Sequence, residues 1–304
     1  MTPSVLYAAD QSDESRRVLA VFNPAAGRSR RRYFEAVVEE LRALGASVSV
    51  VETEAPGHAQ RIAAGASGQE FDVIAAAGGD GTINEIVNGL KGNSVALGII
   101  PLGTANVVAD EIALRRSPAL VARALAHGPI KNIHVGLANN RRFVMMAGMG
   151  FDANVVNGVS LNLKKKIGPL AYIWQAVRQA FAERFTPCEV TIDGKSYQTV
   201  SLVACNGRRY GGPFIAVPQS SLNDAGFYVV LMKGRSWFSI ARYGFGLLIG
   251  RISMWPDVEI VKGSEVVIQS KAGDPVQADG DIITALPVRI HVDPDPVGLI
   301  YPPA

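Results

Sequence analysis

The segment Ala75–Leu90, AAAGGDGTINEIVNGL, decides the fold of this chain, because a buried apolar strand runs through a glycine turn directly into a helix. The strand covers Asp72–Ala77. Apolar residues then repeat at helical spacing: Ile83, Ile86, Val87 and Leu90. Gly78, Gly79 and Gly81 remove side chains where a polyphosphate could approach the backbone. The first turn of the helix presents unpaired N–H groups at the positive end of its dipole, so this segment is suited to holding phosphates.

Asp80 is the only acidic residue of this glycine turn. A carboxylate beside phosphates is repulsive unless Mg²⁺ lies between them, so Asp80 indicates metal–nucleotide chemistry. The structural alternative is a tight strand–helix turn in which Asp80 caps the helix. Thr82, Asn84 and Glu85 favour the functional interpretation, because they add polar groups to the first helical turns.

The composition is that of a globular protein. The chain has 304 residues, of which 48% are hydrophobic and 19% charged, and this length predicts two domains. No apolar run reaches the ~18 residues of a membrane-spanning helix. Residues 1–16 are polar, so we expect a disordered leader and not a secretory signal. Two cysteines alone do not indicate a disulfide framework, which favours a cytoplasmic location.

The net charge of +3 is too small to indicate nucleic-acid binding. The positive charges form three clusters: Arg28 with Arg30, Arg31 and Arg32; Lys164, Lys165 and Lys166; and Arg208 with Arg209. Charge runs are typical of solvated faces, and phosphate contact or attraction to an anionic membrane are the alternatives.

Strand and helix patterns alternate from Val18 to about Leu125, which predicts a parallel sheet covered on both faces. Polar turns follow the predicted strands at Asn23–Gly27, Glu52–Glu54, Gly78–Thr82 and Pro101–Asn106. Ligands of open α/β sheets bind outside the carboxyl ends of the strands. We therefore expect these turns to meet at a ligand site.

After Ile130 the pattern changes to short alternating strands and Asp-Gly turns, which predicts an antiparallel β domain. Two segments, Leu170–Phe185 and Trp237–Ile249, instead have helical spacing and many aromatic residues. We expect these aromatics to be core, with a lipid pocket as the alternative. The predicted domains are 17–129 and 130–304, after a leader over 1–16.

Seven motifs follow one another along the chain. They are Asn23-Pro24-x-x-Gly27, Gly78–Glu85, Pro101–Asn106, Gly148–Ala153, Gly168–Tyr172, Asn206–Pro218 and Asp279–Asp281. In this order they resemble the diacylglycerol and sphingosine kinases, and among these the bacterial soluble lipid kinases, over residues 17–292. The resemblance implies an α/β fold: an N-terminal Rossmann-like nucleotide-binding domain of the NAD kinase/diacylglycerol kinase type, joined to an antiparallel β-sandwich domain. The implied activity is ATP-dependent phosphorylation of a lipid hydroxyl.

The same resemblance implies ATP and Mg²⁺ at the first domain. The implied nucleotide contacts are Asn23, Thr53, Gly78, Gly79, Asp80, Gly81, Thr82, Ile83, Asn84 and Thr104. Threonine hydroxyls and backbone N–H groups would bind phosphate oxygens, and Asp80 would approach the Mg²⁺ ion.

The implied proton acceptor is Asp281, which stands where the family has the Glu of an Asp-Gly-Glu motif. Aspartate is shorter by one methylene, so its carboxylate would reach the hydroxyl through a shifted strand or a water. The structural alternative for Asp279–Asp281 is a turn between strands. Asp152 is the second candidate, because sphingosine kinases use the matching aspartate to bind the lipid head.

The segment Leu222–Phe227 resembles a turn that holds a structural Mg²⁺ in some bacterial members. This implies a metal site at Asp224, Ser221 and Phe227, although Ala225 is an extra residue compared with the family pattern. An insertion here matters because Mg²⁺ requires near-octahedral geometry.

The resemblance also implies a lipid substrate at a membrane surface, reached by peripheral association with the inner membrane. Lys164–Lys166 beside Ile167–Trp174 is the expected docking patch. Diacylglycerol, a sphingoid base, ceramide and phosphatidylglycerol are the candidate acceptors, and a homodimer is left open. Two rival interpretations remain: an NAD kinase-like soluble nucleotide kinase, and a non-catalytic lipid or nucleotide sensor with the same fold.

Overall fold

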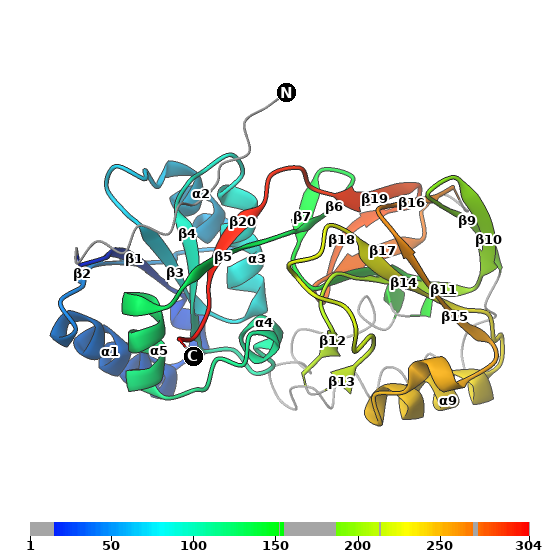
Figure 1. Cartoon of the computed structure of the whole chain (residues 1–304), viewed down its shortest axis with the longest axis horizontal. Coiled ribbons are helices and arrows are strands. Elements are labelled where there is room, and N and C mark those ends of the chain that lie inside the picture. The colour runs from blue at the N-terminus through cyan, green and yellow to red at the C-terminus, as the bar shows by residue number, and fades with distance from the viewer. Residues whose placement is uncertain (1–14, 152, 155–186, 213, 270–272, 304) are drawn as a thin grey trace. The chain divides into compact units, whose positions relative to one another are not determined.

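The computed structural model describes residues 15–303 except 152, 155–186, 213 and 270–272 (Figure 1). The chain forms two compact units. Unit 1 comprises Met1–Ile133 and Asp295–Ala304, and unit 2 comprises His134–Pro294. Asp152, Lys164–Lys166 and Leu170–Phe185 lie outside the described residues, as does the motif Gly168–Tyr172.

Unit 1 is the predicted α/β domain. Its sheet has the order β2-β1-β3-β4-β20-β5. The strands are β2 (Ser47–Glu52), β1 (Arg17–Phe22), β3 (Val73–Gly78), β4 (Ala96–Pro101), β20 (Val297–Ile300) and β5 (Ile130–Ile133). All neighbours are parallel except β20 and β5. Strands β3 and β4 are buried along their whole length, as expected for the central strands of a parallel sheet covered on both faces.

Helices cover both faces of this sheet (Figure 1). They are α1 (Arg28–Ala43), α2 (His58–Gly65), α3 (Asp80–Gly89), α4 (Val107–Glu111) and α5 (Pro118–His127). Helix α1 packs beside α5, and α2 packs beside α3. The chain passes from β1 to β2 on one side and then to β3 on the other, so the strand order reverses at β1. Ligands bind at such a reversal, outside the carboxyl ends of the strands.

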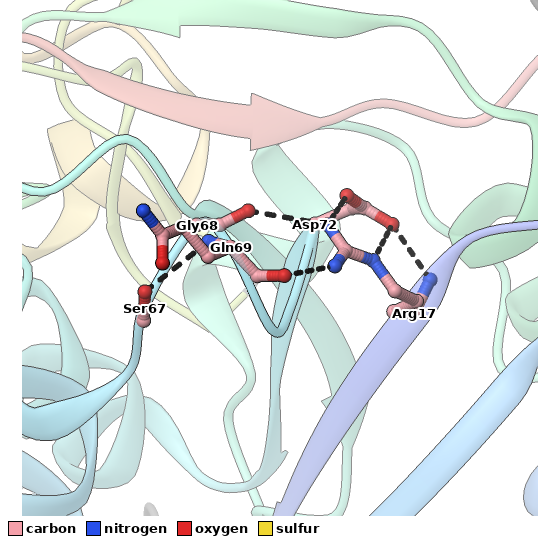
Figure 2. Close-up of polar contacts among 5 residues, drawn as sticks. All are labelled: Arg17, Ser67, Gly68, Gln69 and Asp72. Carbon is pink, nitrogen blue, oxygen red and sulfur yellow. Dashed lines mark hydrogen bonds and ion pairs between the residues drawn. The ribbon is translucent and has the colours of Figure 1, made fainter.

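Arg17 fixes the register of β1 and β3 at the amino ends of the two strands, away from the carboxyl ends where ligands of such sheets bind (Figure 2). Its guanidinium binds the Asp72 carboxylate at 2.6 Å and the carbonyl of Gly68 at 3.1 Å, and it also contacts the carbonyl of Gln69. The backbone N–H of Arg17 donates to the same carboxylate at 2.8 Å. These bonds join the start of β1 to the residues just before β3, and thereby set which residues meet where the strands end.

Unit 2 is the predicted antiparallel β-sandwich. One sheet has the order β10-β9-β16-β19-β6-β7, and the other β15-β14-β11-β8-β17-β18. The first contains β10 (Lys195–Thr199), β9 (Cys188–Ile192), β16 (Glu265–Ile268), β19 (Val288–Val292), β6 (Gly136–Ala138) and β7 (Arg141–Phe143). The second contains β15 (Val258–Gly263), β14 (Phe227–Met232), β11 (Ser201–Cys205), β8 (Met146–Met149), β17 (Pro275–Ala278) and β18 (Asp281–Ala285). Side chains from both sheets form one buried core, in which Phe143 stacks on Phe227.

Shorter elements complete unit 2: β12 (Arg209–Gly211), β13 (Phe214–Ile215), α9 (Trp237–Leu248) and the 3-10 turn η2 (Ile252–Met254). The helix predicted over Trp237–Ile249 is confirmed. The expectation that its aromatics are core is wrong for Trp237 and Phe238, whose exposed fractions are 54% and 58%. Helical spacing identified the helix but did not show which of its faces is buried.

The division of the chain differs from the predicted domain boundaries at three places. The first unit extends to Ile133, because β5 belongs to its sheet. The last ten residues also belong to it, because β20 inserts between β4 and β5. At the N-terminus, Arg16 donates to the carbonyls of Leu125 and Gly128 at 2.9 and 2.7 Å, so this residue is part of the folded unit and not of a leader.

Candidate active site

Asn23 joins the turns that follow β1 and β3. Its backbone N–H donates to Ala77 O at 2.9 Å, and its Oδ1 accepts from Ala25 N at 3.0 Å. Its Nδ2 donates to Thr82 Oγ1 at 3.2 Å. Two residues expected at one nucleotide site, 59 positions apart in sequence, are therefore in direct contact where the strand order reverses.

Glycines allow the turns after β3 and β4 to approach each other. A Cβ on Gly78 would lie 2.3 Å from Thr82 Oγ1, and a Cβ on Gly103 would lie 2.6 Å from Gly79 Cα. Both distances are shorter than any real contact of this kind. Gly78 and Gly103 are thus required by packing within the protein, whereas Gly81 is exposed at the start of α3.

The N-terminus of α3 carries the Asp80 carboxylate. Gly79 is the N-cap and Asp80 is the first helical residue, so Asp80 does not cap α3. Its Oδ1 instead accepts from Val108 N, in the first turn of α4, at 3.3 Å. The N–H groups of Gly79 and Gly81 donate to no other described residue. The arrangement offers backbone donors to an anion, with one carboxylate beside them.

The other residues expected to contact the nucleotide fall into two groups. Two lie in turns after strands, and two are buried in α3. Thr53 follows β2, where its N–H donates to Phe22 O at 2.9 Å, and Thr104 is exposed in the loop after β4. Ile83 has an exposed fraction of 1%, and its N–H already bonds to Gly79 O at 3.2 Å. Asn84 is also buried, and its Oδ1 accepts from Asn88 at 3.1 Å. Ile83 and Asn84 therefore support α3, while Thr53 and Thr104 lie in the turns after β2 and β4, at the carboxyl ends of the strands.

Two polar residues organise this edge through contacts that were not expected from the sequence. Glu85 accepts from Gly57 N at 2.8 Å and from Ala59 N at 3.1 Å, and so caps α2, which has no capping side chain of its own. Asn106, fully buried at φ 49°, bonds to both the N–H and the carbonyl of Gly103 at 2.7 and 2.8 Å. A carboxylate just inside a helix that follows a glycine turn was the available signal for Glu85.

An ion pair lies at the ends of β1 and β2. The Arg31 guanidinium makes two bonds to the Glu52 carboxylate, at 2.8 and 3.0 Å, and lies 4.6 Å from the ring centre of Phe22. Hydrogen bonding to Glu52 raises the pKa of Arg31, and the same bond lowers the pKa of Glu52. One member of the N-terminal arginine cluster is therefore a paired charge at the carboxyl ends of β1 and β2.

In unit 2, Asp279 connects the β17–β18 hairpin to the strands beside it. Its carboxylate accepts from three consecutive backbone N–H groups, those of Val144, Met145 and Met146, at 2.8, 2.8 and 3.2 Å. Asn206 Nδ2 donates to the carbonyl of Val144 at 2.7 Å. Residues from two of the sequence motifs, which lie far apart in the chain, thus hold one short segment of backbone.

Asp281 lies two positions after Asp279 in the same hairpin. Asp279 and Gly280 form the tight turn of the hairpin, with φ 48° and 85°, so the turn expected as the structural alternative is present. Asp281 begins β18 and is exposed, and its carboxylate makes no hydrogen bond or ion pair with another described residue. The two aspartates therefore differ: Asp279 is a structural acceptor, and Asp281 presents its carboxylate to solvent.

At the predicted metal site of Ser221, Asp224 and Phe227, a lysine ammonium group lies beside the carboxylate in place of a metal ion. The Asp224 carboxylate lies 3.8 Å from the Lys262 ammonium, and the carbonyl of Ser221 accepts from Asp224 N at 3.0 Å. Across the described part of the chain, no three His, Cys, Asp or Glu side chains form a group that could hold a metal. This loop does not fit a resident Mg²⁺ ion, since the ammonium already supplies positive charge to its one carboxylate.

Comparisons with known proteins agree over most of the chain. Residues 17–138 match the model of the diacylglycerol kinase catalytic domain, and residues 145–301 match that of the YegS C-terminal NAD kinase beta sandwich-like domain. A diacylglycerol kinase of Bacillus subtilis (strain 168) is 30% identical over 278 residues, covering 90% of this chain and 92% of the relative. One from Staphylococcus saprophyticus is 26% identical, covering 90% and 91%.

Solved structures show the same fold. A diacylglycerol kinase structure from Bacillus anthracis str. Sterne superimposes with a TM-score of 0.79 at 24% identity, covering 96% of this chain and 99% of that one. The class of protein is thus a kinase with an α/β catalytic domain and a β-sandwich domain. The chain belongs to the diacylglycerol kinase family, and the protein is accordingly a lipid kinase.

No helix in the part of the chain that the structure describes has the length and hydropathy to cross a bilayer.

Proposed function

We propose that the protein transfers the γ-phosphate of ATP to the hydroxyl of diacylglycerol at the surface of the inner membrane. The observation that best supports ATP binding is the contact of Asn23 with Thr82 beside the N-terminus of α3. The names of the B. subtilis and S. saprophyticus relatives support diacylglycerol as the acceptor. The other candidate acceptors remain outcomes of the test.

The phosphates of ATP would bind at the carboxyl ends of β1, β3 and β4. The N–H groups of Gly79 and Gly81 supply donors, and Thr53 and Thr104 supply hydroxyls at the same edge. Asn23 and Asn106 hold the surrounding turns in place. Donors already fixed by the fold need no reorganisation when charge develops on the transferring phosphoryl group.

The Asp80 carboxylate fits a Mg²⁺ ion carried on the nucleotide, because such ions usually combine one or two carboxylates with phosphate oxygens. The ion would supply charge neutralisation on the phosphates. Within the first turn of α3, Asp80 is the one carboxylate beside the backbone donors. Its bond from Val108 N fixes the orientation of the carboxylate.

In the transfer step, the lipid oxygen forms a bond to the γ-phosphorus while the bond from that phosphorus to the bridging oxygen breaks and ADP leaves. The hydroxyl proton passes to the Asp281 carboxylate, which has no competing partner among the described residues. Asp152, which lies outside the described residues, would orient the lipid hydroxyl.

The test replaces Asp281 with Asn and with Glu. Each variant receives ATP, Mg²⁺ and one of diacylglycerol, sphingosine, ceramide or phosphatidylglycerol in mixed micelles, and mass analysis identifies the product. We expect Asp281→Asn to lower turnover by about 10²- to 10⁴-fold, the usual contribution of a general base, and Asp281→Glu to retain activity. Nucleotide affinity should be the same in both.

Unchanged turnover of Asp281→Asn would remove Asp281 from this role. No product from the unmodified protein with any of the four lipids would favour the sensor interpretation. Phosphorylation of NAD in place of lipid would favour the soluble nucleotide kinase.

A further inference from the structure

Helix α9 presents an apolar face to solvent. Its buried residues, Ser239, Tyr243 and Gly246, lie on one side. The opposite side and the residues that follow it carry large exposed side chains: Trp237, Phe238, Phe245, Leu248, Ile249 and Met254, with exposed fractions of 43% to 65%. Of the ten large exposed hydrophobic residues in the described part of the chain, these six fall within 237–254. Such clustering is typical of a docking surface.

The helix is firmly held on its buried side. Ser236 caps it by accepting from Ser239 N at 3.2 Å. The Tyr243 hydroxyl donates to Asp257 at 2.7 Å and accepts from Gly234 N at 2.8 Å, while burial raises the pKa of Tyr243 and keeps the donor protonated. A Cβ on Gly246 would lie 2.9 Å from Ile252 Cα, so η2 packs directly on α9. The exposed face is therefore part of an ordered element.

The charged side chains of the helix and of the segment that follows it, up to residue 256, are all positive. Residues 233–256 contain Lys233, Arg235, Arg242 and Arg251 and no aspartate or glutamate. Lys233 and Arg242 pair with acidic residues of the following segment. Arg235 and Arg251 are exposed and form no ion pair with another described residue. Exposed aromatic and aliphatic side chains flanked by unpaired arginines suit an anionic lipid surface.

We propose that this surface, the α9 face formed by Trp237, Phe238, Phe245, Leu248, Ile249 and Met254, docks the protein on an anionic bilayer. The proposal rests on the proposed function, because a kinase of diacylglycerol must meet a substrate whose acyl chains lie in a membrane. A second copy of the chain fits less well, since a two-fold contact through this face would bring like charges together.

The test measures co-sedimentation of the full chain with vesicles, without nucleotide. Vesicles contain phosphatidylcholine alone or with phosphatidylglycerol. We expect Phe245→Gln with Leu248→Gln to lower the partition coefficient on anionic vesicles by about tenfold or more, because two side chains no longer enter the lipid. The matched control is Leu44→Gln with Leu120→Gln, which changes two exposed leucines of unit 1 and should bind as the parent does.

A second arm tests the charges. Arg235→Glu with Arg251→Glu should weaken binding to anionic vesicles, remove most of its salt dependence and leave the weak binding to phosphatidylcholine unchanged. Brominated acyl chains should quench part of the tryptophan fluorescence, and Trp237→Phe should reduce that quenching.

Parent-like sedimentation of both double variants would overturn the proposal. It would also be overturned if Phe245→Gln with Leu248→Gln converted a dimer to a monomer in sedimentation velocity while vesicle binding stayed the same. Short-chain diacylglycerol below its critical micelle concentration separates docking from catalysis, because the variants should phosphorylate it at the parent rate. A parent that binds vesicles but phosphorylates no lipid would refute the proposed function and support the docking surface.

Discussion

At the scale of single residues, the contact of Arg17 with Asp72 has a defined dependence on pH. The hydrogen bond from Arg17 lowers the pKa of Asp72 below its usual value of 3.8. The ionised carboxylate is therefore favoured by folding, and its contribution to the free energy of unfolding is complete above the ordinary pKa. It is lost as the pH falls through the lower pKa of the folded state.

We expect Asp72→Asn to lower the free energy of unfolding at neutral pH by up to about 1 kcal/mol, because both side chains are about 40% exposed to solvent. The difference from the parent should shrink as the pH falls below 3.8. The urea midpoints of Asp72→Asn and of the parent, determined at a series of pH values, measure this difference in stability. Glu70→Gln, which changes an exposed carboxylate that has no partner among the described residues, is the control and should show no such trend.

Asp279 and Asp281, two residues apart, should respond differently to the same change. Asp279→Asn keeps a residue that tolerates φ 48° but weakens three hydrogen bonds from backbone N–H groups, so we expect a loss of about 1.5–3 kcal/mol in the free energy of unfolding. Asp281→Asn should leave the urea midpoint unchanged, since its carboxylate bonds to no other described residue. Equal midpoints for the two variants would contradict the structural role of Asp279.

At the scale of elements, helix α2 depends on a side chain from α3. Glu85 bonds to Gly57 N and Ala59 N, and these bonds tie the loop that contains Thr53 to the helix that begins at Asp80. Two candidate nucleotide-binding turns are thus joined through one carboxylate. The arrangement gives the charged residue inside this motif a structural role.

We expect Glu85→Ala to destabilise the protein by about 1–2 kcal/mol, the usual effect of losing a helix cap. Hydrogen exchange should accelerate at the amides of Gly57 and Ala59, and nucleotide affinity should fall because Thr53 loses its fixed position. Glu39→Ala, on the exposed face of α1, is the control. Unchanged exchange at Gly57 would show that the cap does not hold α2.

At the scale of the whole molecule, the chain leaves unit 1 after Ile133 and returns to it at Asp295. Strand β20 then lies inside the sheet, between β4 and β5, with Leu299 fully buried. The C-terminal residues are therefore part of unit 1, although the sequence motifs of that unit end about two hundred positions earlier.

Deletion of residues 295–304 should unfold unit 1 and leave unit 2 folded, because β4 and β5 lose their common neighbour and the core loses Val297, Leu299 and Ile300. Limited proteolysis with mass analysis should show cleavage within 17–133 and protection of 188–268. A chain ending at residue 301 keeps β20 and should resist cleavage. Equal resistance of both truncated chains would contradict the role of β20.

Much of this organisation could be predicted from local patterns. Alternating strand and helix periods identified β1, β2, β3 and β4 with their helices. The Asp-Gly turns indicated antiparallel pairs such as the β9–β10 hairpin, which turns at Asp193-Gly194. Glycine motifs located the ends of the strands where ligands bind. These predictions succeed because hydrophobic periodicity and turn chemistry depend on residues close together in the chain.

The sequence by itself determined the two fold types, the strand ends that carry the polar turns, and the resemblance that led to a lipid kinase. Only the tertiary structure decided that β20 completes the first sheet, that Asn23 contacts Thr82, that Glu85 caps α2, and that α9 exposes its aromatic face. The physical reason is that these features depend on strand order and on contacts between distant segments, whereas a helical period gives the spacing of an apolar face but not what covers it.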